Sequence, residues 1–245
     1  MNRTRLEISQ GLWLDARRAV WLERESVLAV SDLHLGYAWA HRHSGQLMPV
    51  TSPEDSVDRL LALVDDYQPR DLILLGDIVH SAVALPPLQE ELCRLFSELS
   101  SRTALRLVAG NHDTQLARLL AKCGLTAPLL TEWIAGSYQL VHGDQSDHVA
   151  LREPSAVMTI MGHEHPAISV GDRVTRIKCP CFLVSPQVIV LPAFSRWAAG
   201  TDVLSTRFLS PLAGQTPFHQ AIAILADKLL PVPLKPRSPF SARGK

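Results

Sequence analysis

The sequence predicts one α/β domain in which helices cover a sheet with parallel neighbours and the second half adds strands, as in a two-sheet sandwich. Short apolar runs alternate with helical periodicity as far as about residue 122, which is typical of such a sheet. After residue 166 the helical spacing fades and strand-like runs dominate. A chain of 245 residues is long enough for a single α/β domain to bury most of its apolar surface. We therefore expect one domain over residues 1–230.

The first elements follow from a change of period. Residues 6–30 alternate apolar and polar residues in short pieces, which predicts an antiparallel ribbon leading into a central strand, "SVLAV". The segment "SPEDSVDRLLALVDDY" then begins with Ser52 as a candidate N-cap and Pro53 at the first helical position. Its apolar residues fall on one helical stripe: Val57, Leu60, Leu61 and Val64. This segment is expected to be a helix packed on the sheet.

The alternation continues along the chain. It predicts strands at "DLILL", "LRLVA", "YQLVH" and "VMTIM" and helices over 86–100 and 114–122. The stretch "AISVGDRVTRIK" predicts a hairpin that turns at Gly171 and Asp172, followed by the strand "QVIVLPAF". Residues 231–245 contain four prolines, four basic residues and no acid, which predicts a flexible, Pro-rich basic tail.

Composition excludes several classes of protein. With 47% hydrophobic and 20% charged residues and no long apolar run, the sequence predicts a soluble protein without a membrane partner. The arginine-bearing N-terminus lacks the apolar segment of a secretory signal, so we expect a cytoplasmic location. Equal numbers of basic and acidic residues, 24 of each, argue against strong nonspecific nucleic-acid binding. The four cysteines are too scattered for a disulfide framework and are expected to be reduced thiols.

Polar residues end five apolar runs in a similar way. The runs are "LAVSDLH", "ILLGDIVH", "RLVAGNHD", "YQLVHGD" and "TIMGHEH". The carboxyl ends of strands in an open α/β sheet face one crevice, so these endings are expected to meet there. One such Asp or His is usually a turn former, a cap or a hydrogen-bonded structural residue. Six of the ten histidines at five such ends instead indicate one functional site.

The residue types indicate a metal site with nitrogen and oxygen ligands. Aspartate, histidine and asparagine without cysteine suit manganese, iron or zinc. Asp32 and His34 are two positions apart, as are His163 and His165, so each pair projects to one face of extended backbone. Each pair can therefore present both side chains to one cluster.

The ordered motifs D-x-H, G-D-x-x-H, G-N-H-D, a lone H and G-H-x-H resemble those of the calcineurin-like metallophosphoesterase superfamily. The histidine in "GDIVH" makes the sequence similar to the branch that contains Mre11-type nucleases. "SDLHLGY", "MGHEHP", "KCPCF" and "LPAF" resemble the bacterial ligase-associated DNA damage response endonucleases of the PdeM type. The sequence departs from that pattern at Ser195, where a glycine is expected after "LPAF". The resemblance implies a sandwich of two mixed β-sheets flanked by helices.

Carried over by position, the resemblance also implies the roles of the site residues. The first metal is expected to be held by Asp32, His34 and His165, and the second by Asn111, His142 and His163. Asp77 is expected to bridge the two ions. A water bound between them would attack phosphorus. Manganese is the expected metal, with iron or zinc as alternatives.

Four further residues are candidates for supporting roles. His112 is expected to stabilise the transition state or protonate the leaving oxygen, and His80 to orient the substrate. Asp113 is expected not to bind metal itself but to orient His112 or cap the following helix. Arg42 is a candidate for binding a substrate phosphate, although a loop arginine is usually solvated. His41, His43 and His148 are expected at the surface, and Trp39, Trp133 and Trp197 are expected to be buried rather than stacked on bases.

The sequence therefore predicts a manganese-dependent phosphodiesterase that acts as a DNA endonuclease. Hydrolysis of a phosphoester follows from the site, whereas DNA as the substrate follows from the resemblance alone. The resemblance also implies a role in DNA repair alongside a ligase, a helicase and an exonuclease. The enzyme alternative is a phosphodiesterase or phosphatase acting on a cyclic nucleotide or another small nucleotide. A binding scaffold without catalysis is the alternative from another class, and it would show gaps among the ligands or at His112.

Overall fold

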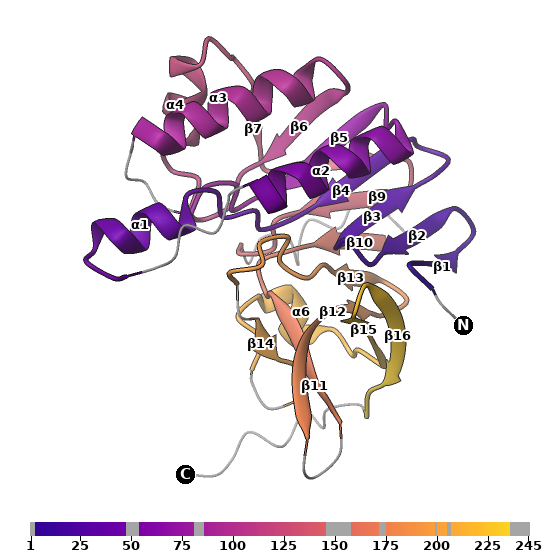
Figure 1. Ribbon diagram of the computed structural model, residues 1–245. Coiled ribbons are helices and arrows are strands. Elements are labelled where there is room, and N and C mark those ends of the chain that lie inside the picture. Colours follow the sequence, from indigo (N-terminus) through magenta and orange to yellow (C-terminus); the bar gives the residue numbers. More distant parts are fainter. Residues whose placement is uncertain are drawn as a thin grey trace.

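Two β-sheets face each other at the centre of the molecule, and helices cover the outer faces (Figure 1). This computed structural model describes residues 3–47, 54–80, 86–145, 158–171, 175–198, 200–204 and 207–235. The order of layers is helices, first sheet, second sheet and a short helix. The predicted two-sheet α/β sandwich is confirmed.

The first sheet contains strands in chain order, each beside its neighbour in sequence. They are β1 (Arg5–Ser9), β2 (Leu12–Asp15), β3 (Ala19–Leu22), β4 (Val27–Val30), β5 (Asp71–Leu75), β6 (Ala104–Val108) and β7 (Leu129–Leu130). The strands from β1 to β4 are antiparallel, which confirms the predicted ribbon. From β4 onward the pairing is parallel, and helices provide the crossovers.

The second sheet uses the later part of the chain. Its strands are β8 (Glu132–Ala135), β9 (Tyr138–Val141), β10 (Met158–Met161), β11 (Pro166–Gly171), β12 (Arg176–Val184), β13 (Val188–Val190), β14 (Thr201–Asp202), β15 (Gln220–Leu225) and β16 (Lys228–Pro233). Strands β9, β10 and β13 are parallel, whereas β11 and β12 form the predicted antiparallel hairpin. The turn of that hairpin at Asp172 lies outside the described residues.

Five helices complete the described fold. They are α1 (Tyr37–His43), α2 (Glu54–Tyr67), α3 (Pro86–Ser100), α4 (Leu116–Lys122) and α6 (Pro211–Gln215). Helices α2, α3 and α4 confirm the three helices predicted from periodicity, while the proposed cap of α2 at Ser52 and Pro53 lies outside the described residues. Helix α1 was not predicted, because it has only one buried residue, Ala38, and hence no apolar stripe. Within the described residues, no helix is both long and apolar enough to cross a membrane.

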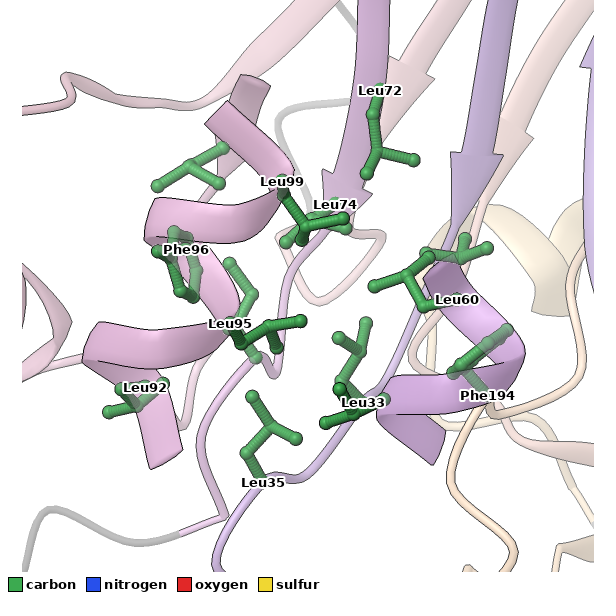
Figure 2. Close-up of a cluster of buried hydrophobic side chains, with 14 of the residues drawn as sticks. Leu33, Leu35, Leu60, Leu72, Leu74, Leu92, Leu95, Phe96, Leu99 and Phe194 are labelled. Carbon is green, nitrogen blue, oxygen red and sulfur yellow. The ribbon is translucent and has the colours of Figure 1, made fainter. Parts of the chain in front are cut away.

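Strand β5 shows why the central strands are apolar throughout. Leu72 and Leu74 point into the core under helices α2 and α3, whereas Ile73 and Leu75 point into the core between the two sheets. Figure 2 shows the first of these cores, with Leu72 and Leu74 facing the leucines of α3. Burial of each such side chain contributes about 1.5–3 kcal/mol. A strand covered on both faces is thereby held firmly, and its carboxyl end is a rigid platform for polar residues.

The C-terminal strands were not predicted, and they shorten the expected tail. Residues 231–233 belong to β16, which pairs with β15 as far as Pro233. Proline is tolerated there because β16 lies at the edge of the described sheet, where one side of its backbone has no strand partner. The rest of the predicted tail, from residue 236, lies outside the described residues.

The prediction of four reduced cysteines was wrong for one pair. Cys93 of α3 and Cys123 at the end of α4 form a disulfide. The two helices pack side by side and bring these positions together across 30 residues of sequence. Spacing along the chain carried no sign of that packing. Cys179 and Cys181 are buried free thiols, as expected.

Candidate metal centre

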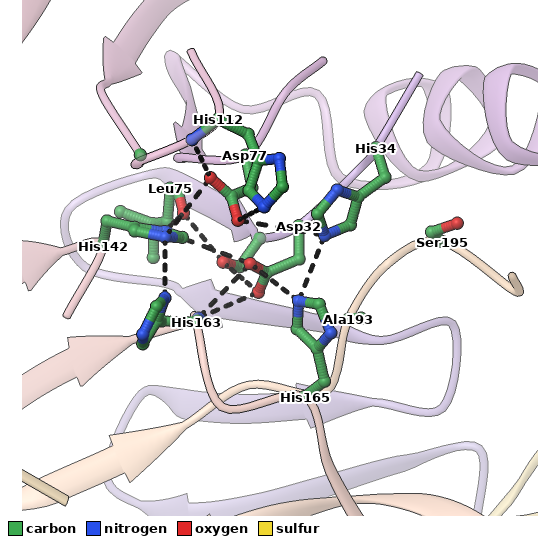
Figure 3. A network of polar contacts seen from close by, with 12 residues as sticks. Asp32, His34, Leu75, Asp77, His112, His142, His163, His165, Ala193 and Ser195 are labelled. Atoms are coloured by element: carbon green, nitrogen blue, oxygen red, sulfur yellow. Dashed lines mark hydrogen bonds and ion pairs between the residues drawn. The ribbon is translucent and has the colours of Figure 1, made fainter. Parts of the chain in front are cut away.

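The predicted site residues converge where strands of both sheets end. Asp32, Asp77 and Asn111 follow the parallel strands β4, β5 and β6 of the first sheet. His142 and His163 follow the parallel strands β9 and β10 of the second sheet, and His165 lies just before β11. Figure 3 shows the two carboxylates between imidazoles that arrive from both sheets. The site is therefore built across the interface of the sandwich.

The backbone at these strand ends is unusual. Five of the predicted ligands are in the left-handed region: Asp32, His34, Asp77, His163 and His165, with φ of 57°, 45°, 49°, 68° and 45°. This conformation costs a residue other than glycine roughly 1–2 kcal/mol. Such strain clusters at functional sites, where the surrounding structure holds the residues in place. The concentration of strain at these positions thus marks a functional site independently of the motifs.

Three glycines allow the loops of the site to approach one another. A Cβ at Gly76 would overlap the His142 ring, and one at Gly110 would overlap the backbone and carboxylate of Asp77. A Cβ at Gly162 would lie 2.6 Å from the Asp32 carboxylate. Because a real Cβ essentially never comes within 3.0 Å, only glycine fits at these three positions.

The first cluster contains Asp32, His34, Asp77 and His165, each of which offers one ligand atom within 4.8 Å of the others. Nε2 of His165 lies 3.1 Å from Oδ1 of Asp32 and 3.2 Å from Nε2 of His34. Asp32 is fully buried, and His34 and Asp77 are nearly so. These are the residues predicted for the first metal together with the predicted bridge.

The second cluster contains Asp77, His142 and His163. Nε2 of His142 lies 3.5 Å from Oδ1 of Asp77, 3.3 Å from Nδ1 of His163 and 3.4 Å from Oδ1 of Asn111. Asn111 is thus within reach of the same cluster. Asp77 is therefore common to the two clusters.

The close approach of imidazole nitrogens tests whether these residues suit a metal ion. Nε2 of His34 faces Nε2 of His165 at 3.2 Å, and Nε2 of His142 faces Nδ1 of His163 at 3.3 Å. Two neutral nitrogens that bind one cation at about 2.0–2.2 Å come to lie roughly 3 Å apart. Both pairs have this spacing, and the carboxylate and amide oxygens complete a set suited to a borderline or hard divalent ion. The residues therefore fit a divalent metal.

Hydrogen bonds outside the clusters orient the ligands. The Ser31 hydroxyl donates to Oδ2 of Asp32 at 2.6 Å, and the backbone N–H of His163 donates to the same oxygen at 3.1 Å. Nδ1 of His142 donates to the Leu75 carbonyl at 2.9 Å, which leaves its Nε2 directed at the site. Partners of this kind fix the ligand rings and are part of a metal site. Ser31 was not among the predicted site residues, although "SDLH" places it directly before Asp32.

Asp113 supports the site through the backbone. Its carboxylate accepts the N–H groups of Ile78 and Val79 at 2.9 and 3.1 Å and that of Gly110 at 3.0 Å. It thereby ties the loop after β5, which carries Asp77, to the loop after β6. Among the described residues its carboxylate bonds to neither the His112 ring nor a backbone N–H of α4, whose N-cap is Gln115, so the expectation that this side chain orients His112 or caps α4 is not met. Asp113 is in neither ligand cluster, and its carboxylate bonds to other partners than the predicted ones.

Electrostatics favour the binding of cations in the clusters. Burial would raise the pKa of Asp32, but the charges of His165 and His142 and the Ser31 hydroxyl outweigh it and hold that pKa below its usual range. The buried carboxylates in turn raise the pKa values of His165 and His142 despite their burial. Burial lowers the pKa of His34 to about 3 against the pull of Asp32, so its ring is neutral and free to act as a ligand.

His112 and His80 lie beside the first cluster. Their ring nitrogens and one of His34 lie within 4.8 Å of one another. Nδ1 of His112 donates to the His80 carbonyl at 2.8 Å, so its Nε2 faces the site, 3.9 Å from Oδ2 of Asp77. Burial and the charges of His112 and His41 lower the pKa of His80 to about 4. His80 is therefore neutral near pH 7, and its backbone positions His112.

Aromatic rings that sequence reasoning did not assign to the site extend from His80. The Tyr37 ring lies 4.4 Å from that of His80 and stacks at 6.0 Å on Trp197. His41, expected at the surface, is half-buried and stacks on His80 at 5.5 Å. These residues form a wall beside the histidine pair. In the sequence, only Tyr37 of this wall belongs to a motif of the site, "SDLHLGY".

The remaining predicted residues lie apart from this centre or outside the description. Arg42 is exposed on α1, with its guanidinium 6.0 Å from the Trp39 ring, and none of its described contacts reaches a ligand. His43 is exposed, as predicted, and His148 lies outside the described residues. Trp39, Trp133 and Trp197 are half-buried, so they are neither fully buried, as predicted, nor fully exposed for stacking on bases.

Comparison with known proteins agrees with this geometry. The family model described as calcineurin-like phosphoesterase matches residues 26–167, which contain all seven predicted ligands. No curated protein matches the chain at a significant level. A solved structure of the Pseudomonas putida nuclease MPE is 22% identical with a TM-score of 0.69, and the match covers 94% of this chain and 100% of that one. The phosphoesterase Yfce of E. coli is 15% identical with a TM-score of 0.42, and the match covers 85% of this chain and 99% of that one. With its fold, its cluster of candidate ligands and a family match over more than half of its length, the chain belongs to the calcineurin-like phosphoesterases and is a metal-dependent phosphoesterase.

Proposed function

We propose that this protein is a phosphodiesterase with two metal ions that cleaves DNA as an endonuclease. The observation that supports two ions is the position of Asp77, which belongs to both ligand clusters. A carboxylate shared in this way holds two ions close together, at the spacing used for in-line displacement at phosphorus. The first ion would be held by Asp32, His34 and His165, and the second by Asn111, His142 and His163.

Divalent ions at this centre would supply Lewis acidity, positive charge for the phosphate and a lowered pKa of bound water. The chain's own residues orient and shield the site. Ser31 and the N–H of His163 hold Asp32, and the Leu75 carbonyl holds His142, so the ligand atoms keep their directions before substrate arrives. Burial of Asp32 and His142 excludes water from the rear of the centre.

His112 is the residue best placed to deliver a proton to the leaving oxygen. Its Nδ1 donates to the His80 carbonyl at 2.8 Å, so Nε2, which faces the site, is the nitrogen that would carry and release the transferred proton when the ring is doubly protonated. The ring is half-buried and therefore accessible to a substrate at the mouth of the centre. General acid catalysis of this kind contributes about 10²- to 10⁴-fold.

DNA as the substrate, manganese as the metal and a role in DNA repair rest on the resemblance of the motifs. The same resemblance is the basis for proposing kinship with the PdeM-type endonucleases and association with a ligase, a helicase and an exonuclease. The nuclease that shares this fold supports the choice of a phosphodiester of nucleic acid as substrate.

The test combines metal analysis with a substrate panel. Protein loaded with Mn²⁺ is analysed for metal per chain and incubated with supercoiled plasmid, single-stranded DNA and bis-p-nitrophenyl phosphate. We expect two ions per chain and cleavage of both DNA and the small diester. His112→Ala is expected to lose about 10²- to 10⁴-fold in kcat on DNA. His43→Ala, which removes an exposed histidine of α1, is the matched control and should keep wild-type activity.

Two results would overturn the proposal. Hydrolysis of the small diester with plasmid and single strands left intact at high enzyme would assign a small phosphodiester as substrate. Binding of a single ion by a fully active enzyme would exclude the shared role of Asp77.

A further inference from the structure

A cavity of about 210 Å³ opens directly beside the first ligand cluster. One of its walls is His165, and three of its lining residues are basic: Arg18, Lys178 and Arg196. Among the described residues that line it, none carries a carboxylate. A protein with equal numbers of acidic and basic residues thus concentrates positive charge at the edge of its metal centre.

Backbone carbonyls hold two of these cations in place. Arg18 reaches from the turn between β2 and β3 and donates from Nη1 to the carbonyls of Ala193 and Ser195 at 2.8 and 2.6 Å. Nζ of Lys178 donates to the Gly200 carbonyl at 2.9 Å. These three carbonyls are neutral acceptors, so they fix the directions of Arg18 and Lys178 without adding negative charge to the cavity. Positive groups held in this way are preorganised for an anion.

The small cavity shares lining residues with a larger one. Arg18, Pro180 and Arg196 also line a second cavity of about 850 Å³, which continues past Arg5 and Arg17. The second cavity contains both signs of charge, including Asp15 and Asp66, so it is not itself an anion site. It does provide room for a chain that continues beyond the first cavity.

We propose that the cavity lined by Arg18, Lys178 and Arg196 binds the phosphate next to the one that is cleaved, in a single strand of nucleic acid. This inference rests on the proposed function, because it takes the metal centre as the position of the cleaved phosphodiester. His165 belongs both to the first ligand cluster and to the cavity wall, which places the two phosphates side by side. The cavity explains how a neutral protein selects a polyanionic strand over a single phosphoester.

The test measures binding to metal-free protein, so that it does not depend on catalysis. A fluorescent single-stranded oligonucleotide is titrated by anisotropy in EDTA at several salt concentrations. Lys178→Gln and Arg196→Gln are each expected to raise Kd about 5- to 10-fold at low salt and to reduce the salt slope by about 0.7, the loss of one phosphate contact. Lys122→Gln removes one exposed charge from α4, outside both cavities, and should keep the wild-type Kd and slope. Arg18 is left intact, since its substitution would also release the loop at residues 193–195.

A second probe locates the contact on the strand. In an otherwise identical oligonucleotide, one uncharged methylphosphonate replaces a single phosphate, and its position is varied along the strand. At one position wild-type protein should bind it more weakly than the natural strand by at least the factor that Lys178→Gln loses, and Lys178→Gln should lose less at that position than the wild type does. If thymidine 5′-monophosphate displaced the strand with an equal Kd, the cavity would be a site for terminal phosphates and the inference would be wrong.

The two proposals fail separately. Should Lys178→Gln and Arg196→Gln bind as Lys122→Gln does, the phosphate site is excluded, whatever the enzyme hydrolyses. Should the metal-loaded wild type hydrolyse no phosphodiester while the charge-dependent binding is observed, the proposed function is excluded and the cavity remains an anion site.

Discussion

Replacement of Gly162 by alanine should disable the metal centre without unfolding the protein. A Cβ at this position would overlap Oγ of Ser31 and would lie 2.6 Å from both Oδ2 of Asp32 and Cβ of Ser31. To reach the 3.4 Å of an ordinary contact with Asp32, the loop after β10 must move by at least about 0.8 Å, and the overlap with Ser31 demands a larger shift or the loss of its hydrogen bond to Asp32. Because the carboxylate is fully buried and held by Ser31, it has no room to withdraw.

A displacement of this size is large for a metal ligand. Misplacement of a reacting group by about 1 Å costs on the order of 10²-fold in rate, and loss of orienting partners costs about 10- to 100-fold in metal affinity. We expect Gly162→Ala to weaken Mn²⁺ binding by at least about 10-fold in calorimetric titration and to lower kcat/KM on bis-p-nitrophenyl phosphate by about 10²-fold.

The matched control is Gly214→Ala in α6. A Cβ at Gly214 meets no atom within 4 Å, and alanine favours a helix more than glycine does by about 1 kcal/mol. This variant should bind metal and turn over substrate as the wild type does. Wild-type metal affinity and activity in Gly162→Ala would refute the reasoning that the close approach of this loop to Asp32 builds the site.

Three further predictions concern stability. Burial raises the pKa of Glu91 to about 7 against the charge of Arg94, and among the described residues neither of its carboxylate oxygens has a hydrogen-bond partner. The pKa of Glu91 in the folded protein exceeds its unfolded value of 4.5, so the free energy of unfolding of the wild type should fall by about 3 kcal/mol as pH rises from about 4.5 to 7. Urea titrations should show that Glu91→Gln removes this fall. The control Glu90→Gln, at an exposed position, should leave the fall unchanged. Burial opposes ionisation of Asp15, but hydrogen bonds from Arg17 and Tyr67 outweigh it and lower its pKa. Asp15→Asn should therefore lower the free energy of unfolding by at least about 2 kcal/mol at pH 7. The difference in stability between wild type and variant should shrink below about pH 4 in acid titrations, and a difference that stayed constant with pH would contradict this prediction. Removal of metal with EDTA should lower Tm in calorimetry, since ions that bind only the folded state stabilise it, and an unchanged Tm would argue against bound metal.

Much of the fold was readable from local patterns. The strand "DLILL" and the helix stripe around Leu60 were predicted correctly because both faces of the first and one face of the second are buried, and burial leaves a periodic apolar signature. Strand β7, with two residues, and strand β15, whose apolar run "AIAIL" lacks flanking turn signals of its own, were missed. Their formation depends on neighbouring strands, and no local period reports that.

The residues of the metal centre also fall into those that the sequence predicted and those that it did not. Asp32, His34, Asp77, Asn111, His142, His163 and His165 were predicted from the sequence because each follows a recognisable strand, and parallel strands end at a common edge. Residues that act through distant partners gave no such signal. Ser31 mattered only once Asp32 was placed, and Arg18 reached the loop at Ala193 across 175 residues of sequence.

By itself the sequence determined the strongly periodic strands and helices, such as β5 and α2, and the chemical types gathered at the strand ends, because periodicity and residue chemistry are local properties. Tertiary structure alone decided that Cys93 meets Cys123, that Asp113 ties two loops together through backbone N–H groups and that basic residues from three separate segments line one cavity beside His165. These features depend on distances between segments, and such distances are set by how helices and sheets pack rather than by the order of residues along the chain.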